Sequence, residues 1–211
     1  MLPPTGARTG RHGLVGSKTA VALGTEDREM PGRLARMRTG ERSDLVGPAG
    51  TGWRRGAPGR ALLVAGGVGA PPLVAVAGML AEAGVAFDAI LGAQSAPRLW
   101  GRERLRELGA DVVAITTDDG TAGLRGLTTD AMAQLLEART YAQVYTCGPA
   151  PMMAGVARLA AAAGIACQVS CEQLMGCGFG ACACCNVRAA EGGYRSCCTD
   201  GPVFDATEVV L

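Results

Sequence analysis

The chain has 211 residues, of which 48% are hydrophobic and 18% charged, enough for one sizeable core and a small additional segment. A formal net charge of +1 and an aromatic content of 4% argue against partners such as nucleic acid or an anionic membrane. No apolar run is long enough to span a bilayer, and the amino terminus lacks the apolar part of a signal peptide. We therefore expect a cytoplasmic protein.

The amino-terminal part differs in composition from the rest. Residues 1–33 are rich in Gly, Arg, Thr and Pro and show no sustained period, so we expect little ordered structure there. Residues 34–53 are better organised and end in a Gly/Pro cluster that marks a boundary. The chain is divided accordingly into residues 1–55, an α/β unit at 56–169 and a cysteine-rich segment at 170–211.

The middle unit alternates short apolar strands with helices. This order is typical of a parallel sheet with helices on both faces, here an α/β fold with five parallel strands. The expected strands cover residues 61–65, 85–91, 111–116, 142–146 and 165–169. The expected helices cover residues 72–83, 98–108 and 128–138, and a last one opens within C-G-P-A-P-M-M and ends near 163.

A glycine-rich loop, G-G-V-G-A-P-P, joins the first strand to its helix. Gly66, Gly67 and Gly69 allow tight turns and the close approach of a ligand. The helix amino terminus offers free N–H groups and a positive dipole end to a phosphate. The alternative interpretation is a purely structural turn, since the loop is not the common G-x-G-x-x-G fingerprint.

A second loop of this kind follows the fourth strand, where Cys147, Gly148 and Pro149 precede a helix. The stretch T-T-D-D-G-T-A-G, with Asp118 and Asp119, follows the third strand and adds polar groups to the same edge. The carboxyl ends of parallel strands meet at one edge, so these loops are expected to converge on a crevice. The alternatives are a small buried thiol for Cys147 and a solvated turn for 116–123.

Six of the nine cysteines lie in C-G-F-G-A-C-A-C-C, residues 177–185, and C-C, residues 197–198. Disulfides are not expected in a reducing compartment, and so many thiols in short stretches favour a metal centre. Cys177, Cys182, Cys185 and one later cysteine follow the C-x4-C-x2-C pattern of plant-type [2Fe–2S] sites. Gly178 and Gly180 let backbone N–H groups turn inward. Structural zinc, usually held by two C-x2-C pairs, and a set of free thiols are the alternatives.

The adjacent cysteines leave a choice of ligand. Using Cys184 instead of Cys185 would give C-x4-C-x-C, so the spacing favours Cys185. Spacing alone does not decide between Cys197 and Cys198.

The segment E-Q-L-M-G-C-G-F-G-A-C-A-C-C, followed by C-C-T-D-G-P-V-F-D, resembles the electron-transfer subunit of two-subunit, NAD-linked dihydroorotate dehydrogenase. In that family a cysteine stands just before the D-G-P-V-F motif, which implies Cys198 as the fourth ligand and Cys185 as the third. The loops G-G-V-G-A-P-P-L, T-D-D-G-T-A-G and C-G-P-A-P-M-M resemble the nucleotide domain of the ferredoxin–NADP reductase superfamily. G-P-A-G-T-G-W resembles the segment before that domain, so the resemblance runs from about residue 34 to 211.

The resemblance implies a chemistry. Electrons from the FMN of a dihydroorotate-oxidising catalytic subunit would reach a [2Fe–2S] cluster, then FAD, then NAD, within a cytoplasmic heterotetramer for pyrimidine biosynthesis. The cluster would be held by Cys177, Cys182, Cys185 and Cys198. The nucleotide phosphates would face Gly66, Gly67 and Gly69, with Asp118 and Asp119 as further contacts. The nicotinamide and flavin would lie near Cys147, Gly148 and Pro149.

The amino-terminal part departs from the family pattern. The family binds FAD mainly in a β-barrel of the reductase kind, with an R-x-Y-S-like motif that is not found here. Residues 1–55 are therefore expected to be a remnant of that domain, with FAD bound weakly or not at all. The sequence does not decide between NAD and NADP. Gln94 stands where many relatives carry Arg, so an arginine that would bind the extra phosphate of NADP is not obvious, and Arg98 is only a candidate substitute. The alternatives are a related reductase module of another redox complex and a zinc-stabilised interaction module.

Overall fold

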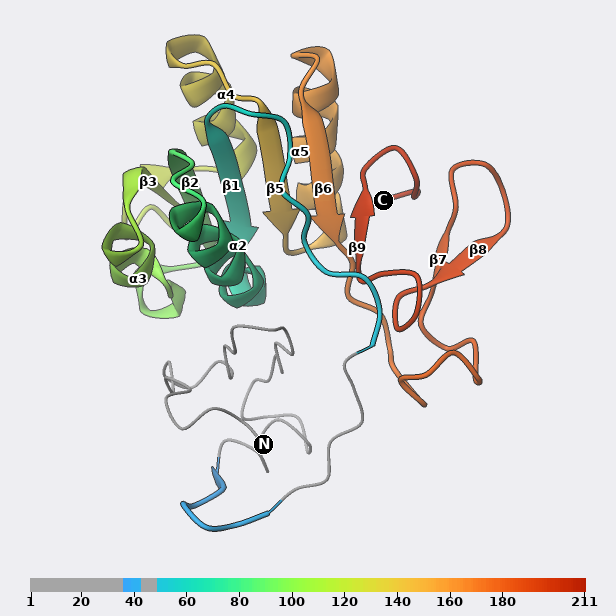
Figure 1. The fold of residues 1–211 in the computed structure, drawn as a ribbon. Helices are drawn as coiled ribbons and strands as arrows, with labels where there is room; N and C mark the ends of the chain where they lie inside the picture. The colour runs from blue at the N-terminus through green and yellow to red at the C-terminus, as the bar shows by residue number, and fades with distance from the viewer. Residues whose placement is uncertain (1–35, 43–48) are drawn as a thin grey trace.

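The computed structural model describes residues 36–42 and 49–211 (Figure 1). The expectation for residues 1–33 lies outside the described residues. From residue 61 onward the chain forms a single seven-stranded sheet with helices on both faces, and a small two-stranded hairpin stands between the last two strands of that sheet in sequence. The predicted α/β class is confirmed.

The sheet has the strand order β4-β3-β2-β1-β5-β6-β9. All neighbouring strands from β4 to β6 are parallel, and β9 is antiparallel to β6. The five predicted strands are present with ends shifted by one or two residues, and β4 and β9 are additions at the two edges. The strands are β1 (Ala61–Gly66), β2 (Phe87–Ala93), β3 (Ala110–Thr117), β4 (Leu124–Arg125), β5 (Gln143–Cys147), β6 (Ala166–Ser170) and β9 (Val203–Asp205).

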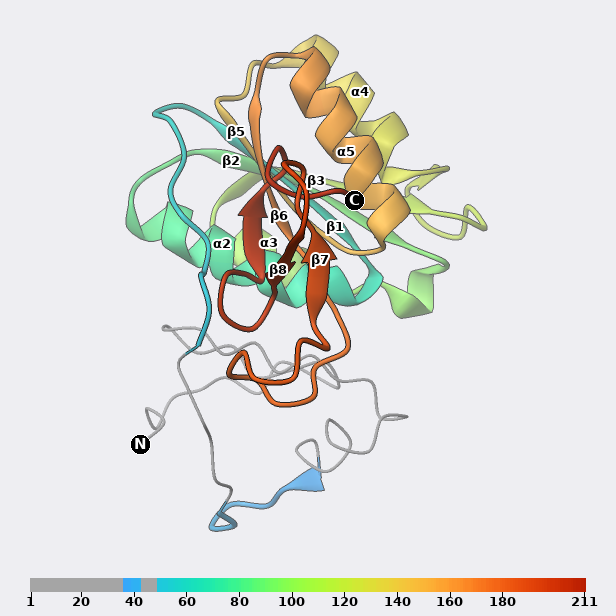
Figure 2. The ribbon, with the colours of Figure 1, turned by 90° about the vertical axis from the view of Figure 1, so that its right-hand side faces the viewer.

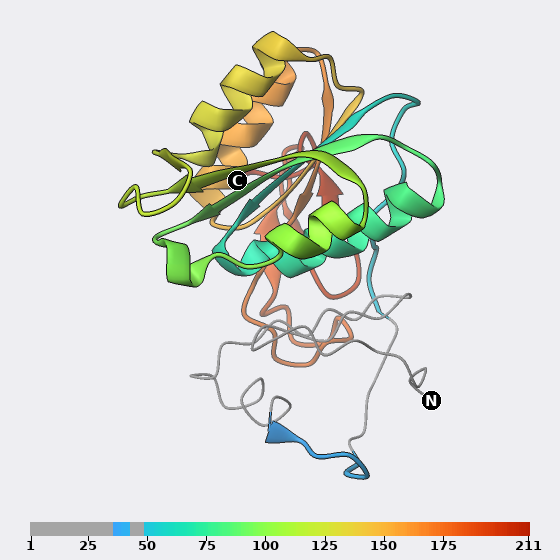
Figure 3. The ribbon, with the colours of Figure 1, turned by 90° about the vertical axis from the view of Figure 1, so that its left-hand side faces the viewer.

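Two helices cover each face of the sheet, as the side views show (Figures 2 and 3). Helices α2 (Ala70–Glu82) and α3 (Arg102–Glu107) lie on one face, and α4 (Thr128–Ala138) and α5 (Ala150–Ala162) lie on the other. The short helical turns η2 (Gly67–Gly69) and η3 (Ala96–Arg98) follow β1 and β2. Within the described ranges, no helix has the length and apolarity needed to cross a membrane.

The central strand β1 explains why the sheet is buried on both faces. Its six residues are all buried, and they alternate between two apolar cores. Leu62 and Val64 pack under α4 and α5, whereas Leu63 and Ala65 pack under α2 and α3. Side chains of successive strand residues point to opposite faces, so a strand covered on both sides is apolar throughout.

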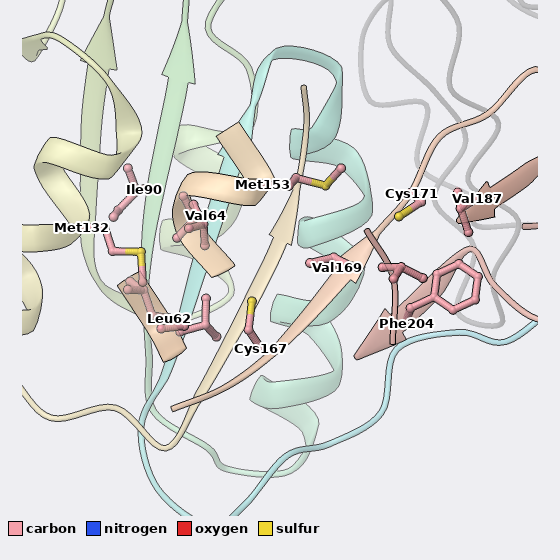
Figure 4. Close-up of a cluster of buried hydrophobic side chains, with 14 of the residues drawn as sticks. Leu62, Val64, Ile90, Met132, Met153, Cys167, Val169, Cys171, Val187 and Phe204 are labelled. Carbon is pink, nitrogen blue, oxygen red and sulfur yellow. The ribbon is translucent and has the colours of Figure 1, made fainter. Parts of the chain in front are cut away.

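The cysteine-rich segment shares the core under α5 rather than having a separate one. Cys171, Val187 and Phe204 belong to the same buried cluster as Val169 of β6, as the close-up shows (Figure 4). The segment contains the hairpin β7 (Asn186–Arg188) and β8 (Tyr194–Ser196), and then returns to the sheet as β9. The cysteine-rich segment, expected from residue 170 onward, therefore packs against the sheet through shared apolar contacts.

A buried carboxylate fastens the amino ends of the strands. Asp88 of β2 is fully buried, and its oxygens accept hydrogen bonds from Arg139 Nη1 at 3.1 Å, the Tyr141 hydroxyl at 2.8 Å and the Val112 N–H at 3.0 Å. Arg60 lies 3.4 Å away and also pairs with Asp111. Burial, followed by the bond to Asp88, raises the pKa of Tyr141. This network lies at the sheet edge opposite the glycine loops.

Candidate functional site

The loops that follow β1 and β5 lie at the point where the strand order reverses. From β1 the chain adds β2 and β3 on one side of the sheet, and β5 and β6 then lie on the other side. In open α/β sheets, ligands bind outside the carboxyl ends of the strands at this switch point. The sheet thus brings the two predicted glycine loops, 66–69 and 147–149, to one place.

The two loops touch each other closely. A Cβ atom built at Gly69 would overlap the carbonyl oxygen of Cys147, and one at Gly148 would come within 3.0 Å of the Gly66 nitrogen. Gly66 also leaves room for Met152, the α5 side chain that packs against it. Three of the glycines are therefore required for loop packing.

Gly67 differs from the other glycines of the first loop. It has a φ of 53°, a conformation that glycine adopts readily, and a Cβ there would meet nothing within 4 Å. Gly67 and the neighbouring Val68 are exposed. The exposed part of the loop, where a ligand has space to approach, is therefore Gly67 and Val68.

The first turn of α2 offers fewer free donors than the sequence led us to expect. Pro71 and Pro72 have no N–H, and the N–H of Ala70 donates to the Gly67 carbonyl. The favourable dipole of the helix end remains. Direct hydrogen bonds to a phosphate would therefore have to come mostly from the 67–69 turn.

Asp118 and Asp119 follow β3 at the same edge, and both are exposed. The Asp119 carboxylate accepts hydrogen bonds from the Thr121 hydroxyl at 2.6 Å and the Thr121 N–H at 2.9 Å, which lower the pKa of Asp119. The Thr121 hydroxyl in turn accepts a bond from the Ala96 N–H at 2.8 Å. Asp119 thus organises the turn and joins it to the loop after β2.

Cys147, the last residue of β5, is buried, and burial raises the pKa of its thiol to about 12. The Ser170 side chain, at the end of the neighbouring β6, hydrogen-bonds to the thiol, and Cys171 and Glu172 lie within electrostatic reach. The cysteine-rich segment therefore starts beside the β5 loop, at the edge where the glycine loops lie.

The loop 177–182 directs backbone N–H groups at two of the predicted ligand sulfurs. The N–H groups of Phe179, Cys182 and Ala181 hydrogen-bond to the Cys177 sulfur, the last at 3.3 Å, and lower the pKa of that thiol to about 6. Gly180 provides a similar N–H to Cys198. Gly178 and Gly180 have φ values of 79° and 86°, which turn successive amides to one side.

Such a nest of amides suits a group that carries negative charge on sulfur. Hydrogen bonds to the sulfurs are among the main features by which a protein tunes an iron–sulfur cluster. The donor set, thiols with inward N–H groups, thus fits a [2Fe–2S] cluster.

The predicted ligand thiols contact one another in pairs. Cys182 hydrogen-bonds to Cys177, and Cys185 hydrogen-bonds to Cys198 and accepts a further bond from the Cys198 N–H at 3.4 Å. The interaction with Cys185 raises the pKa of Cys198. Among the residues described, no three His, Cys, Asp or Glu side chains gather closely enough to hold one metal ion. The four thiols are thus grouped two by two.

The two remaining cysteines of the adjacent pairs lie in different surroundings. Cys184 is exposed and hydrogen-bonds to Cys182. Cys197 is buried in the core beside Cys171, and burial raises its pKa to about 12. This difference was not evident from the spacing.

Residues 49–53, the described part of the stretch G-P-A-G-T-G-W, have a role that the sequence did not reveal. Thr51 forms a parallel bridge with Pro202, and its N–H donates to the Gly201 carbonyl. Gly50 lies so close to Gly201 that a Cβ on residue 50 would overlap the Gly201 carbonyl oxygen. This segment therefore packs directly on D-G-P-V-F. Only the three-dimensional pairing brings these distant motifs together.

Two buried side chains hold the next residues of this segment to the sheet. The Arg54 carbonyl accepts bonds from the Tyr145 hydroxyl at 3.0 Å and Gln168 Nε2 at 2.9 Å, and Arg54 pairs with Asp205 of β9 at 3.0 Å. Trp53 packs edge-on against Tyr145 with ring centres 5.8 Å apart. The segment thus links β5, β6 and β9.

Comparison with known proteins agrees with this arrangement. The profile of the iron–sulfur cluster binding domain of dihydroorotate dehydrogenase B matches residues 172–210, and that of the oxidoreductase NAD-binding domain matches residues 63–158. The dihydroorotate dehydrogenase B (NAD(+)) electron transfer subunits of Geobacillus kaustophilus and Bacillus caldolyticus are 40% and 41% identical to this chain over 185 residues. These matches cover 84% of this chain and 69% of each relative.

Among solved structures, an NADH-dependent reduced ferredoxin-NADP oxidoreductase, studied for flavin-based electron bifurcation, is 33% identical with a TM-score of 0.75. The match covers 86% of this chain and 65% of that chain, so this chain spans slightly less than two thirds of its length. The fold and the cysteine-rich segment define a ferredoxin reductase-like oxidoreductase with an iron–sulfur segment. More narrowly, the chain belongs to the family of electron transfer subunits of NAD-linked dihydroorotate dehydrogenase B.

Proposed function

We propose that this chain is an electron-transfer subunit that connects a partner's FMN, through a [2Fe–2S] cluster and FAD, to NAD+. The observation that carries the proposal is the loop in which backbone N–H groups converge on the thiols of Cys177 and Cys198. Its position, beside the switch point of a sheet that matches the oxidoreductase NAD-binding domain, supports it further. The partner would be the FMN-binding catalytic subunit that oxidises dihydroorotate in pyrimidine biosynthesis.

The cluster would be held by four cysteines, two for each iron. The contact between Cys177 and Cys182, and that between Cys185 and Cys198, support this division. When bound, the cluster supplies one-electron transfer, whereas flavin and nicotinamide supply the hydride chemistry. The chain's own contribution is to hold the sulfurs and to direct the amides of Phe179, Gly180 and Ala181 at them.

The nicotinamide nucleotide would bind at the switch point between β1 and β5. Within the Gly66–Gly69 loop, the 67–69 turn has the exposed backbone on which the nucleotide would lie. Cys147, Gly148 and Pro149 would border the nicotinamide and flavin. Cys147 would act there as a neutral, buried thiol, because burial raises its pKa to about 12. Asp118 is the freer carboxylate of its loop, since Asp119 is bound to Thr121.

The partner would dock on the apolar surface around the cluster loop. Leu174, Met175 and Phe179 are exposed there by 81%, 53% and 65%. Large exposed apolar side chains gathered on one loop mark an interaction surface, and electron transfer requires short distances between centres.

The test is to purify the full chain after iron–sulfide reconstitution, and to measure iron, sulfide, visible absorption and the EPR signal after dithionite reduction. Two irons and two sulfides per chain are expected, with a rhombic EPR signal. Added NAD+, FAD and the FMN-binding partner should then give dihydroorotate-dependent NADH formation. A colourless protein with one zinc ion would refute the proposal.

A second candidate is a reductase module of another redox complex. The similarity to an NADH-dependent ferredoxin-NADP oxidoreductase favours it. If the reconstituted chain carries the cluster but supports NAD+ reduction only with a ferredoxin, and not with the dihydroorotate-oxidising partner, this candidate is the correct one.

A further inference from the structure

The cysteine-rich loop holds one more thiol than a cluster needs. Cys184 hydrogen-bonds to the Cys182 thiol, and Cys177 and Cys185 lie within electrostatic reach of it. A Cβ built at Gly176 would lie 3.1 Å from the Cys182 sulfur and 3.4 Å from the Cys184 sulfur. Cys182 and Cys184 therefore bring their sulfurs to the same side of the loop.

The backbone between these two cysteines is unusual. Ala183 has a φ of 54°, and it is the one non-glycine residue with a positive φ in the described part of the chain. This left-handed conformation brings the Cβ of a non-glycine residue too close to the following carbonyl oxygen, so it is unfavourable. Such strain is kept where the surrounding structure requires a particular arrangement.

Cys197 provides the contrast. Like Cys184 it precedes an expected ligand in the sequence, but it is 1% exposed and belongs to the apolar core. Its N–H is bonded to the Cys185 carbonyl at 2.9 Å. The expected ligands Cys185 and Cys198 are buried in the same core, so burial alone does not separate Cys197 from them. The difference is in the thiol neighbours: Cys197 interacts most with Cys171, which is not an expected ligand, whereas Cys184 hydrogen-bonds to the expected ligand Cys182.

We propose that Cys184 is a reserve ligand that replaces Cys182 on iron when Cys182 is lost. The inference rests on the [2Fe–2S] site of the proposed function. The Cys184 thiol releases its proton to solvent, and its sulfur bonds iron in the position that Cys182 vacates, with no change in the oxidation state of the irons. Because Cys182 is exposed, a peroxide can oxidise its sulfur to a sulfenic acid, with the peroxide reduced to water, and a neighbouring thiol would then preserve the cluster.

The test uses the full chain reconstituted with iron and sulfide. Alanine is chosen because a serine oxygen can itself bind iron. Cys182→Ala is expected to retain most of the iron and sulfide, with altered EPR g-values and visible circular dichroism, whereas Cys182→Ala/Cys184→Ala loses both. Cys184→Ala alone keeps the wild-type spectra.

The matched control is Cys198→Ala, which also leaves an adjacent cysteine in place, the buried Cys197. We expect it to lose the cluster. Far-UV circular dichroism and thermal melting check that the sheet is folded in every variant.

The outcomes separate the two proposals. A wild-type chain without a cluster overturns the proposed function. Suppose that the wild-type chain carries a cluster but Cys182→Ala retains as little iron and sulfide as Cys198→Ala. That result overturns only the reserve-ligand proposal. Retention of the cluster by Cys198→Ala would also overturn it, because adjacency in sequence would then suffice.

Discussion

At the scale of single residues, the contact between the loops after β1 and β5 depends on the absence of side chains. Gly69 has an ordinary helical φ of −75°, so its backbone does not require glycine. What requires glycine is the carbonyl oxygen of Cys147, which occupies the place of a Cβ. At this point the loops after β1 and β5 can therefore approach each other only because residue 69 has no side chain.

Gly69→Ala is expected to push the two loops apart. Overpacking of this kind costs about 1–3 kcal/mol, and the displaced loops should weaken NADH binding as well. Thermal denaturation and titration with NADH measure the two effects. Gly78→Ala, on α2 with nothing within 4 Å of the added Cβ, is the control and should be as stable as wild type or more so. Equal behaviour of the two variants would contradict this account of Gly69.

The choice of ligands among adjacent cysteines is also decided residue by residue. Cys184→Ser and Cys197→Ser should keep the [2Fe–2S] absorption and EPR spectra, because neither residue is an expected ligand. Cys185→Ser and Cys198→Ser should lose or alter the spectra, since these thiols contact each other inside the segment. The opposite pattern would mean that the assignment is shifted by one residue.

At the scale of elements, Asp88 ties β2 to β3 and to the end of α4. Its carboxylate has no exposed surface, and Arg139, Tyr141 and the Val112 N–H all donate to it. Asp88→Ala would leave the buried Tyr141 hydroxyl and the part-buried Val112 N–H without an acceptor and should cost about 1–3 kcal/mol of unfolding free energy for each unsatisfied group. Urea denaturation of the wild-type and Asp88→Ala chains measures this loss of unfolding free energy.

The control for Asp88 is an ion pair on the surface. Glu107→Ala removes the partner of Arg104 on α3, where the two side chains are 63% and 46% exposed. Such a pair contributes at most about 1 kcal/mol. If both variants unfold at the same urea concentration, the Asp88 network does not stabilise the strand ends as described.

At the scale of the whole molecule, the proposed electron path joins carriers of different capacity. NADH gives two electrons as a hydride, whereas the cluster accepts one at a time. A flavin is needed between them. Dithionite should therefore reduce the cluster of the reconstituted chain directly, and NADH should do so only in proportion to the bound FAD. Stopped-flow absorbance with and without added FAD tests this, and rapid NADH reduction in a flavin-free sample would refute it.

Much of the fold follows from the local pattern. The apolar runs around Leu62 and Val144 predict strands because the sheet is buried on both faces. Strands β4 and β9, with two and three residues, are too short to show a period. The pairing of Thr51 with Pro202 joins residues far apart in sequence, which no local pattern reveals.

The candidate site was predictable to a similar degree. The spacing of Cys177, Cys182 and Cys185 indicates an iron–sulfur loop, since ligand spacing is a local property. The different surroundings of Cys184 and Cys197 depend on how the loop packs against β6 and β9, and could not be predicted. The same holds for Pro71 and Pro72, whose missing N–H groups matter only once the helix start is known.

The antiparallel pairing of β6 with β9 has a thermodynamic consequence. Ser170 stands opposite Val203, so the whole cysteine-rich loop is closed by two neighbouring strands of the nucleotide sheet. Whatever binds inside a loop closed in this way stabilises the sheet that closes it. Loading with iron should thus raise the melting temperature of the entire domain, and chelation should lower it. The melting temperature of the sheet would then depend on how much iron the protein has bound.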